Sequence, residues 1–424
     1  MNWKLSDKKN EKQLLIIDQK IDINMKKNTR AVICLLNLVD MKYCLLLLVA
    51  VIFSACSEQV EPEDKYVLRP IDEYLEYKID DDTRVPLYSL YTFAERGVEY
   101  LTFSDPSSRT ILIYDLHSCQ QVKKIPFDRE GPNGIGPVLF GFYVKDFNHI
   151  YIPSVNESFI YLTDTTGVLR NKIDFSCTED GLKTKSAHYT NLNYGQLTFM
   201  GESLYIPQVL NTSLGERMVE ESPIGVLVDT IIGKTTRFPM NYPYVIPYNQ
   251  RHEAIHGTME STQIYDGKNL IVAFNKDEKL YKVDKQGKVE TFPAKSRYLP
   301  RLKFPKFPED FSQTLKKTCE TAEYRNVFYD KYRNVYYRFV SLEAELAPNE
   351  NYHKILHAGK VDFSIMILDE NFNILGETRF PAFTYVPHIC FINKDGLYLS
   401  TSHFKREDYS DDVLRFQRIE LVKK

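Results

Sequence analysis

The chain has 424 residues, which is enough for one large domain or for two or three ordinary ones. Its composition, with 43% hydrophobic and 26% charged residues, is ordinary for a globular protein. A net charge of −3 and the lack of a long Lys/Arg stripe after the N-terminal segment argue against binding to nucleic acid. The 29 Tyr and 25 Phe residues favour half-buried β-strands.

The first 55 residues have the pattern of a processing signal. Residues 1–40 are rich in Lys and Asn, and we interpret them as a mis-assigned extension ahead of a true start at Met41. Lys42 supplies a positive charge, residues 45–53 are almost wholly apolar, and small residues precede Cys56. The apolar run is shorter than the ~20 residues that a membrane-spanning helix needs. Residues 41–55 are therefore predicted to be a cleaved signal peptide.

The segment from Phe53 to Cys56 resembles the lipobox of bacterial lipoproteins, which implies a lipid anchor on Cys56. Residues 56–65 then form an acidic tether, and residues 66–424 form the folded domain. The resemblance implies an outer-membrane or cell-surface location, with a periplasm-facing location as the alternative. An uncleaved signal anchor and an ordinary secretory peptide are the other interpretations of this segment.

A repeated unit fills the rest of the chain, where short apolar runs alternate with Asp, Asn, Gly and Pro. Each unit is a strand, an Asp at a turn, and a second strand that ends near Phe or Pro. The turn residues of five copies are Asp115, Asp164, Asp229, Asp284 and Asp369. Asp followed by Gly favours a tight hairpin. Another strand pair precedes each unit, so the sequence predicts all-β repeats of four strands.

The last repeat predicts how these repeats are arranged. It supplies strands over residues 396–400 and 413–419 and then ends without an outer strand, whereas residues 73–79 have strand character and no repeat of their own. Pairing these two segments would remove a free sheet edge. We therefore predict a six-bladed β-propeller whose last blade is closed by the N-terminal strand. A short helix over residues 311–320 is predicted ahead of the fifth blade.

These features together resemble the six-bladed β-propeller lipoproteins of Bacteroidales, many of which are classed as domains of unknown function. Gly134-Ile135-Gly136-Pro137 matches the Gly-x-Gly-Pro stretch that commonly opens the second blade in that group, although Val138 replaces the acidic residue that often follows. The resemblance implies the fold and no particular reaction. The Gly-rich segment lacks the Lys-Ser/Thr pair and the helix of a phosphate-binding loop, so we interpret it as a structural loop.

His252-Glu253-Ala254-Ile255-His256 is an H-E-x-x-H sequence. On a helix, the two histidines could share a zinc ion while the Glu activates a bound water. Pro247 and Gly257 leave too little room for such a helix, so a metal-dependent hydrolase is only a minor alternative, and no cofactor is predicted.

A different site is predicted where the inner strands begin, because these strand ends converge at one mouth of a propeller channel. The candidate ligand-binding residues there are His188, Asn191, His252, His256, Arg325 and His388. The alternative is that each is a surface residue or a polar group with an internal partner.

Two classes of function remain open. The preferred one is a non-enzymatic binding protein for a glycan, a peptide or a partner protein, because no carboxylate pair stands out. The alternative is a polysaccharide-processing hydrolase or lyase. Four cysteines remain in the domain, namely Cys119, Cys177, Cys319 and Cys390. They could make two bridges in an oxidising compartment, but their wide spacing follows no disulfide or metal framework, so they are predicted to be isolated buried thiols.

Overall fold

The computed structural model describes residues 63–84, 90–187, 195–208, 221–243, 260–305, 310–359 and 361–424. The chain divides into a unit of residues 1–63 and a compact unit of residues 64–424, and the second contains all the helices and strands of the described ranges. None of the described helices is long and apolar enough to cross a membrane.

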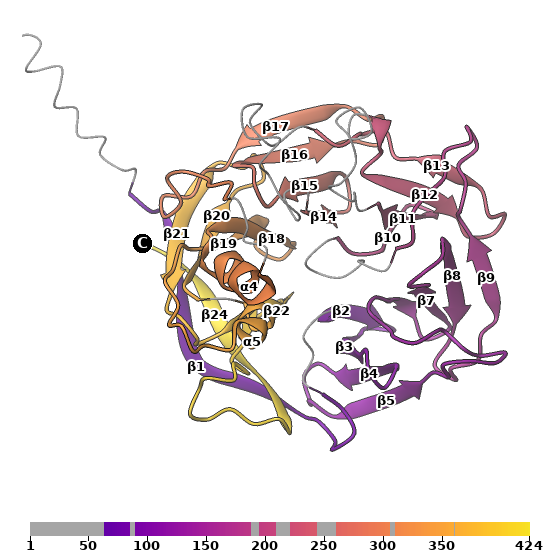
Figure 1. The fold of residues 1–424 in the computed structure, drawn as a ribbon, viewed down its shortest axis with the longest axis horizontal. Helices are drawn as coiled ribbons and strands as arrows, with labels where there is room; N and C mark the ends of the chain where they lie inside the picture. Colours follow the sequence, from indigo (N-terminus) through magenta and orange to yellow (C-terminus); the bar gives the residue numbers. More distant parts are fainter. Residues whose placement is uncertain are drawn as a thin grey trace, which may run out of the picture. The chain divides into compact units, whose positions relative to one another are not determined.

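The described strands form six four-stranded antiparallel sheets around a central axis, which is the predicted six-bladed β-propeller (Figure 1). Blade one contains β2 (Leu90–Glu95), β3 (Val98–Asp105), β4 (Thr110–Asp115) and β5 (Gln121–Pro126). Blade two contains β6 (Tyr143–Asp146), β7 (His149–Pro153), β8 (Phe159–Thr163) and β9 (Asn171–Asp174). Blade three contains β10 (Thr198–Met200), β11 (Ser203–Pro207), β12 (Gly225–Asp229) and β13 (Thr235–Arg237). Blade four contains β14 (Ser261–Tyr265), β15 (Leu270–Phe274), β16 (Lys279–Val283) and β17 (Val289–Pro293). Blade five contains β18 (Glu323–Asp330), β19 (Val335–Ser341), β20 (Phe363–Leu368) and β21 (Ile374–Phe380). Blade six contains β22 (Val386–Asn393), β23 (Gly396–Ser400), β24 (Val413–Lys423) and β1 (Tyr66–Lys78).

The sixth blade joins the two ends of the described unit, as predicted. Its strand order is β1-β24-β23-β22, and the antiparallel register of β1 with β24 runs from Tyr66↔Lys423 to Lys78↔Val413. The strand that closes the ring is longer than the segment of residues 73–79 that the sequence indicated.

Hydrophobic clusters fill all six interfaces between neighbouring blades, because successive side chains of a strand point to opposite faces of its sheet. On β19, Tyr336 packs toward blade four, whereas Tyr337 packs toward blade six. On β15, Ile271 faces blade five and Val272 faces blade three. Both faces of these strands are buried, which explains why their sequences are continuous apolar runs and do not alternate between apolar and polar residues.

The repeated Asp residues cap the turns between the third and fourth strands of the first five blades, which confirms their predicted role. Asp115 Oδ1 accepts hydrogen bonds from the amides of His117 and Ser118, at 3.1 and 2.7 Å. The carboxylates of Asp164, Asp229, Asp284 and Asp369 accept backbone amides two residues further on in the same way. The Gly-rich loop between β5 and β6 contains no helix, as expected of a structural loop.

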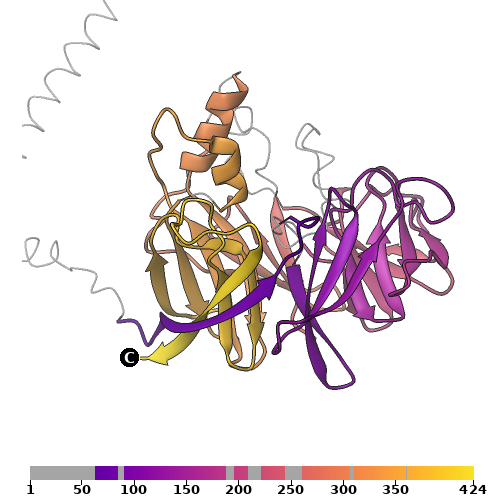
Figure 2. The same ribbon diagram turned by 90° about the horizontal axis from the view of Figure 1, so that it is seen from below.

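Two helices project from one face of the ring (Figure 2). Helix α4 (Phe311–Glu320) matches the predicted helix ahead of the fifth blade, and α5 (Tyr352–His357) lies in the connection between β19 and β20. The two helices share a hydrophobic cluster of their own that includes Cys319 and Ile355. Both belong to the face where the inner strands begin, since α4 leads into β18.

The four cysteines of the described unit form no disulfide. Cys319 and Cys390 are buried, Cys119 is half-buried and Cys177 is exposed. Two of the four thiols predicted to be isolated and buried are therefore buried, and two are not.

We predict that Tyr77→Ala lowers the free energy of unfolding by about 4 kcal/mol. Tyr77 lies on the closing strand, is fully buried, donates to the Leu116 carbonyl at 2.9 Å, and packs edge-on against Tyr114 and Phe416. Its removal leaves a cavity between blades six and one. Urea unfolding followed by circular dichroism measures the loss. Tyr74→Ala is the matched control, because Tyr74 is on the same strand but 42% exposed; equal losses for both variants would contradict the role given to Tyr77.

Candidate functional site

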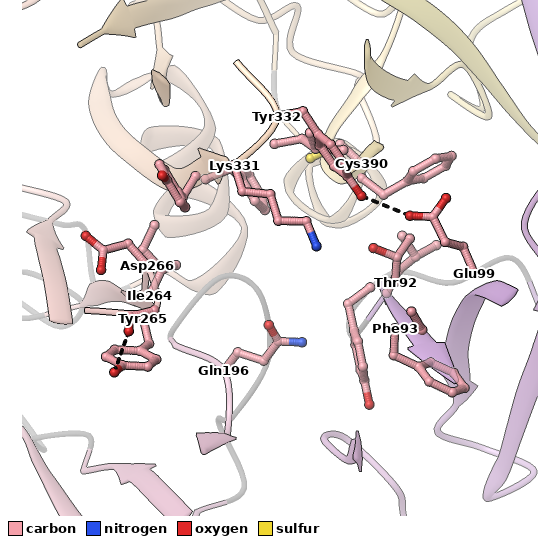
Figure 3. Close-up of a pocket in the computed structure, with 18 residues that line it drawn as sticks. Thr92, Phe93, Glu99, Gln196, Ile264, Tyr265, Asp266, Lys331, Tyr332 and Cys390 are labelled. Carbon is pink, nitrogen blue, oxygen red and sulfur yellow. Dashed lines mark hydrogen bonds between the residues drawn. The ribbon is translucent and has the colours of Figure 1, made fainter. Parts of the chain in front are cut away.

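A cavity of about 450 Å³, here called the channel cavity, lies inside the ring (Figure 3). Its walls come from the inner strands β2, β14, β18 and β22, from the turns that follow β14 and β18, from Glu99 on β3 and from Gln196 just ahead of β10. Most of these residues lie toward the end of the channel where the inner strands end. The aromatic residues that line it are Tyr91, Phe93, Tyr265, Phe328, Tyr329, Tyr332 and Phe391. The polar ones include Thr92, Glu99, Gln196, Asp266 and Lys331.

The turn between β18 and β19 fixes two of these side chains. Buried Asp330 accepts the backbone amides of Tyr332 and Arg333 at 3.0 and 3.1 Å through Oδ1. Its Oδ2 accepts the Arg333 guanidinium at 2.9 Å and the Tyr337 hydroxyl at 3.1 Å. Because this carboxylate ties the turn to itself and to β19, Lys331 and Tyr332 are presented to the cavity from a rigid support.

Glu99, on β3, is engaged through both of its carboxylate oxygens. The Tyr332 hydroxyl donates to Oε1 at 2.9 Å, and His117 Nε2 lies 3.3 Å from Oε2. Burial, and then the hydrogen bond to Glu99, raise the pKa of Tyr332 to about 12. The phenol therefore remains a hydrogen-bond donor at neutral pH and ties blade five to blade one across the channel.

Asp266 is held in the same manner on the wall formed by blade four. Its Oδ1 accepts the backbone amides of Lys268 and Asn269 at 2.8 and 2.7 Å, and its Oδ2 accepts the Tyr336 hydroxyl at 2.7 Å. Burial, and then this hydrogen bond, raise the pKa of Tyr336 well above its usual value. Asp266 thus caps a turn and joins blade four to blade five.

Lys331 and Gln196 differ from these carboxylates. Figure 3 shows the Lys331 ammonium and the Gln196 amide both extending into the cavity. Within the part of the chain that the structure describes, neither group has a hydrogen-bond or ion-pair partner, and the ammonium lies 5.1 Å from the ring centroid of its neighbour Tyr332. The cavity therefore combines aromatic walls with two hydrogen-bond donors that are available to a ligand.

A charged cluster occupies the other end of blade five, where the inner strands begin. Glu323 Oε1 lies 2.8 Å from the Arg325 guanidinium, and Glu323 Oε2 lies 3.2 Å from Lys276 Nζ. The side chains of Glu323 and Lys276 are only 10% and 9% exposed. Arg325, one of the predicted ligand-binding residues, is thus part of an ion-pair network at the predicted mouth.

A family model described as a domain of unknown function, DUF4221, matches residues 68–379, which is well over half of the chain. The chain belongs to the DUF4221 family.

Solved structures agree with this assignment. The DUF4221 chain is similar to the crystal structure of a family member from Bacteroides vulgatus, with 26% sequence identity and a TM-score of 0.74 over 85% of this chain and 99% of that one. It also shares its fold with a candidate exported protein from Bacteroides fragilis, with 12% identity and a TM-score of 0.50 over 84% of this chain and 96% of that one. A search of curated proteins finds no match. The resemblance noted from the motifs is confirmed for fold and family.

The structure of this DUF4221 protein describes only some of the predicted site residues. Arg325 lies in the charged cluster, and His388 is on β22 with only 5% of its surface exposed. The remaining predicted residues, namely His188, Asn191, His252 and His256, with Glu253 and the lipidation site Cys56, lie outside the described residues. Their roles stay predictions. Among the described residues, no group of three or more His, Cys, Asp or Glu side chains could hold a metal ion.

The channel cavity was not predicted from the sequence, because most of its lining residues lie toward the ends of the inner strands and the predicted site lies at their starts. Lys331 and Asp266 directly follow inner strands, in the turns that lead to the second strand of each blade. An aromatic residue followed by an Asp-capped turn, as in Tyr329-Asp330 and Tyr265-Asp266, was the available signal in the sequence.

Blade six of this DUF4221 protein carries a buried histidine, His403, close to helices α4 and α5. It lies at the face of the ring opposite to the channel cavity. His403 is fully buried, its Nδ1 accepts the Lys405 amide at 3.2 Å, and its ring packs against Phe404 and Phe383. Among the residues that the structure describes, none is a hydrogen-bond partner of its Nε2. Burial, and then the charges of Lys405 and Arg406, lower the pKa of His403 to about 4.

We predict that this histidine makes the protein less stable in acid. Because the imidazole has a pKa near 6.5 when unfolded and about 4 when folded, the unfolded chain binds the extra proton between these values. The neutral imidazole makes its full contribution to the free energy of unfolding above pH 6.5, and about 3 kcal/mol of this free energy is lost as the pH falls to 4. Urea unfolding between pH 7 and pH 4 should show this loss in the wild type and a shallower dependence in His403→Gln. His149→Gln, at an exposed histidine, is the control and should keep the wild-type slope; an unchanged slope in His403→Gln would refute the assignment.

Proposed function

We propose that this protein is a lipid-anchored binding protein of the bacterial envelope, and that its ligand occupies the channel cavity. The observation that carries the proposal is a pair of donors, Lys331 and Gln196, inside an aromatic-walled cavity of about 450 Å³, and neither donor has a partner among the described residues. A volume of this size lies within the ~300–1,000 Å³ typical of small-molecule sites.

The lining favours a glycan segment that carries an acidic group. Aromatic faces such as those of Phe93 and Tyr265 can pack against the apolar face of a sugar ring, whereas the Lys331 ammonium can pair with a carboxylate. The Gln196 amide can donate to a hydroxyl or carbonyl oxygen of the same ligand. A peptide or a partner protein would need a chain end or loop small enough to enter the cavity.

The two carboxylates that line the cavity support binding rather than catalysis. A glycosidase needs one carboxyl group that transfers a proton and a second that attacks or activates water. Glu99 is held by Tyr332 and His117, whereas Asp266 is held by Tyr336 and two backbone amides. Because both carboxylates line the cavity, a polysaccharide-processing enzyme remains the second candidate.

We predict that Lys331→Ala weakens ligand binding about tenfold or more, because a charge-assisted hydrogen bond contributes about 1.5–3 kcal/mol. A glycan array that includes acidic oligosaccharides identifies the ligand, and calorimetry measures the affinity of the wild type, Lys331→Ala and Gln196→Ala. Lys123→Ala, at an exposed lysine on the outer strand β5, is the matched control and should bind as the wild type does. Unchanged affinity in both cavity variants would rule out the cavity as the site, and cleavage of a bound oligosaccharide would favour the enzyme.

The membrane anchor is supported by the lipobox ending at Cys56 and by the acidic tether after it. A protein that shares the fold, from Bacteroides fragilis, is described as a candidate exported protein. Attachment to the outer membrane or the cell surface would present the channel cavity to extracellular glycans, and a periplasm-facing arrangement would present it to the cell wall.

We predict that Cys56→Ala abolishes the incorporation of labelled fatty acid and leaves an unprocessed precursor, because alanine has no thiol to which the lipid could be attached before cleavage. Metabolic labelling in a bacterial host, followed by detergent partitioning, measures both effects. Ser57→Ala is the control and should remain lipidated. Label retained by Cys56→Ala would refute the anchor, whereas digestion of the wild type by protease added to intact cells would support the surface location.

A further inference from the structure

Helix α5 carries two histidines that face each other. His353 and His357 are four residues apart, which places their side chains on the same side of the helix. Their rings approach edge to face with centroids 4.4 Å apart, and the two Nε2 atoms are 3.2 Å apart. His353 is exposed to solvent and His357 is half-buried.

The distance between these nitrogens matches that of two ligands on one metal ion. Imidazole nitrogens bind zinc at ~2.0–2.1 Å, so two of them are about 3.4 Å apart in tetrahedral geometry and about 2.9 Å apart at right angles. The observed 3.2 Å lies between these values. We propose that His353 and His357 form a binding site for a divalent transition-metal ion on the helical insertion.

The helix supports this pair firmly, although it is only six residues long. The Asn351 side chain caps its start by accepting the Lys354 amide at 3.0 Å. The Tyr352 hydroxyl lies 2.9 Å from the carbonyl oxygens of both Ala347 and Pro348, which share its one proton, and Ile355 is buried against α4. The two imidazoles therefore start from a fixed geometry, which reduces the entropy lost when the ion binds.

The ligand type determines which ions fit. Imidazole nitrogen suits zinc, copper and nickel, whereas magnesium and calcium prefer oxygen ligands. Since no third His, Cys, Asp or Glu completes a set of three among the described residues, water or a solute would fill the remaining coordination positions of the ion. Such an open site would bind copper most tightly of these ions, in the order copper, then zinc and nickel.

This site is separate from the channel cavity and does not depend on the function proposed for it. The insertion belongs to the face where the inner strands begin, whereas the cavity lies toward the opposite end of the channel. A metal ion that links positions i and i+4 would also stabilise a short helix that is marginal by length alone.

Titration calorimetry of the metal-free full chain with zinc chloride tests the proposal. We expect binding with a dissociation constant of about 10 µM or lower. His353→Ala and His357→Ala should each weaken the same binding phase at least tenfold, because one imidazole ligand is lost. Only a phase lost in both variants belongs to this pair, so metal bound elsewhere on the chain does not obscure the result.

His149→Ala is the matched control, because His149 also contacts a side chain close in sequence, Asp146, but faces no second histidine. It should leave the zinc affinity within twofold of the wild type. Electron paramagnetic resonance of the copper-loaded chain should show two nitrogen ligands in the wild type and fewer in either variant. Equal melting temperatures of the metal-free variants and wild type establish that the fold is intact. Binding only at millimolar zinc, or unchanged affinity in both variants, would overturn the proposal.

Discussion

The pairing of β1 with β24 is the constraint on which the rest of this structure depends. Neighbouring blades bury their faces against each other, so an open array of six blades would expose two apolar faces, whereas a closed ring exposes none. Closure is reinforced at the start of β1, where Asp64 pairs with Arg297 and the Lys65 amide donates to the Leu375 carbonyl at 2.8 Å. The first strand thereby contacts both its own blade and blade five. The walls of the channel cavity come from blades that only the closed ring brings together.

The sequence allowed the architecture to be predicted because the chemistry of the turns repeats. A β-hairpin needs hydrogen-bond acceptors at its turn, and Asp115 and its four counterparts provide them at matching positions in successive blades. Helix α4 was predictable from its length and its flanking residues. Helix α5 was not, because six residues are too few to display a helical period, and its stability comes from Tyr352 and Ile355 packing against α4.

The site was harder to predict than the fold for a geometric reason. Lys331 and Gln196 are far apart in the sequence and lie in no shared motif, so only the curvature of the ring brings them to one cavity. The sequence instead drew attention to residue types with strong chemistry, of which Arg325 is an example. In the structure this guanidinium is paired with Glu323, whose other oxygen binds Lys276, so the charge is largely compensated within the protein. Residue type alone does not distinguish a charge that is neutralised internally from one that is available to a ligand.

Lys331 of the channel cavity and the histidine pair of α5 both belong to blade five. The contacts that hold blade five against blade four explain how firmly these residues are supported. Arg338, on β19, is fully buried and stacks on the Tyr324 ring at 3.7 Å. Its guanidinium donates to the carbonyls of Asp277, Glu278 and Ala294 in blade four, at 2.6, 2.9 and 2.8 Å. Burial lowers the pKa of Arg338 to about 10, so the group remains charged at neutral pH. A buried charge is stable only while its hydrogen bonds are kept, so blades four and five cannot slide past each other without a large cost. Since Lys331 lies at one end of this blade and α5 at the other, the same buried guanidinium fixes the support of both.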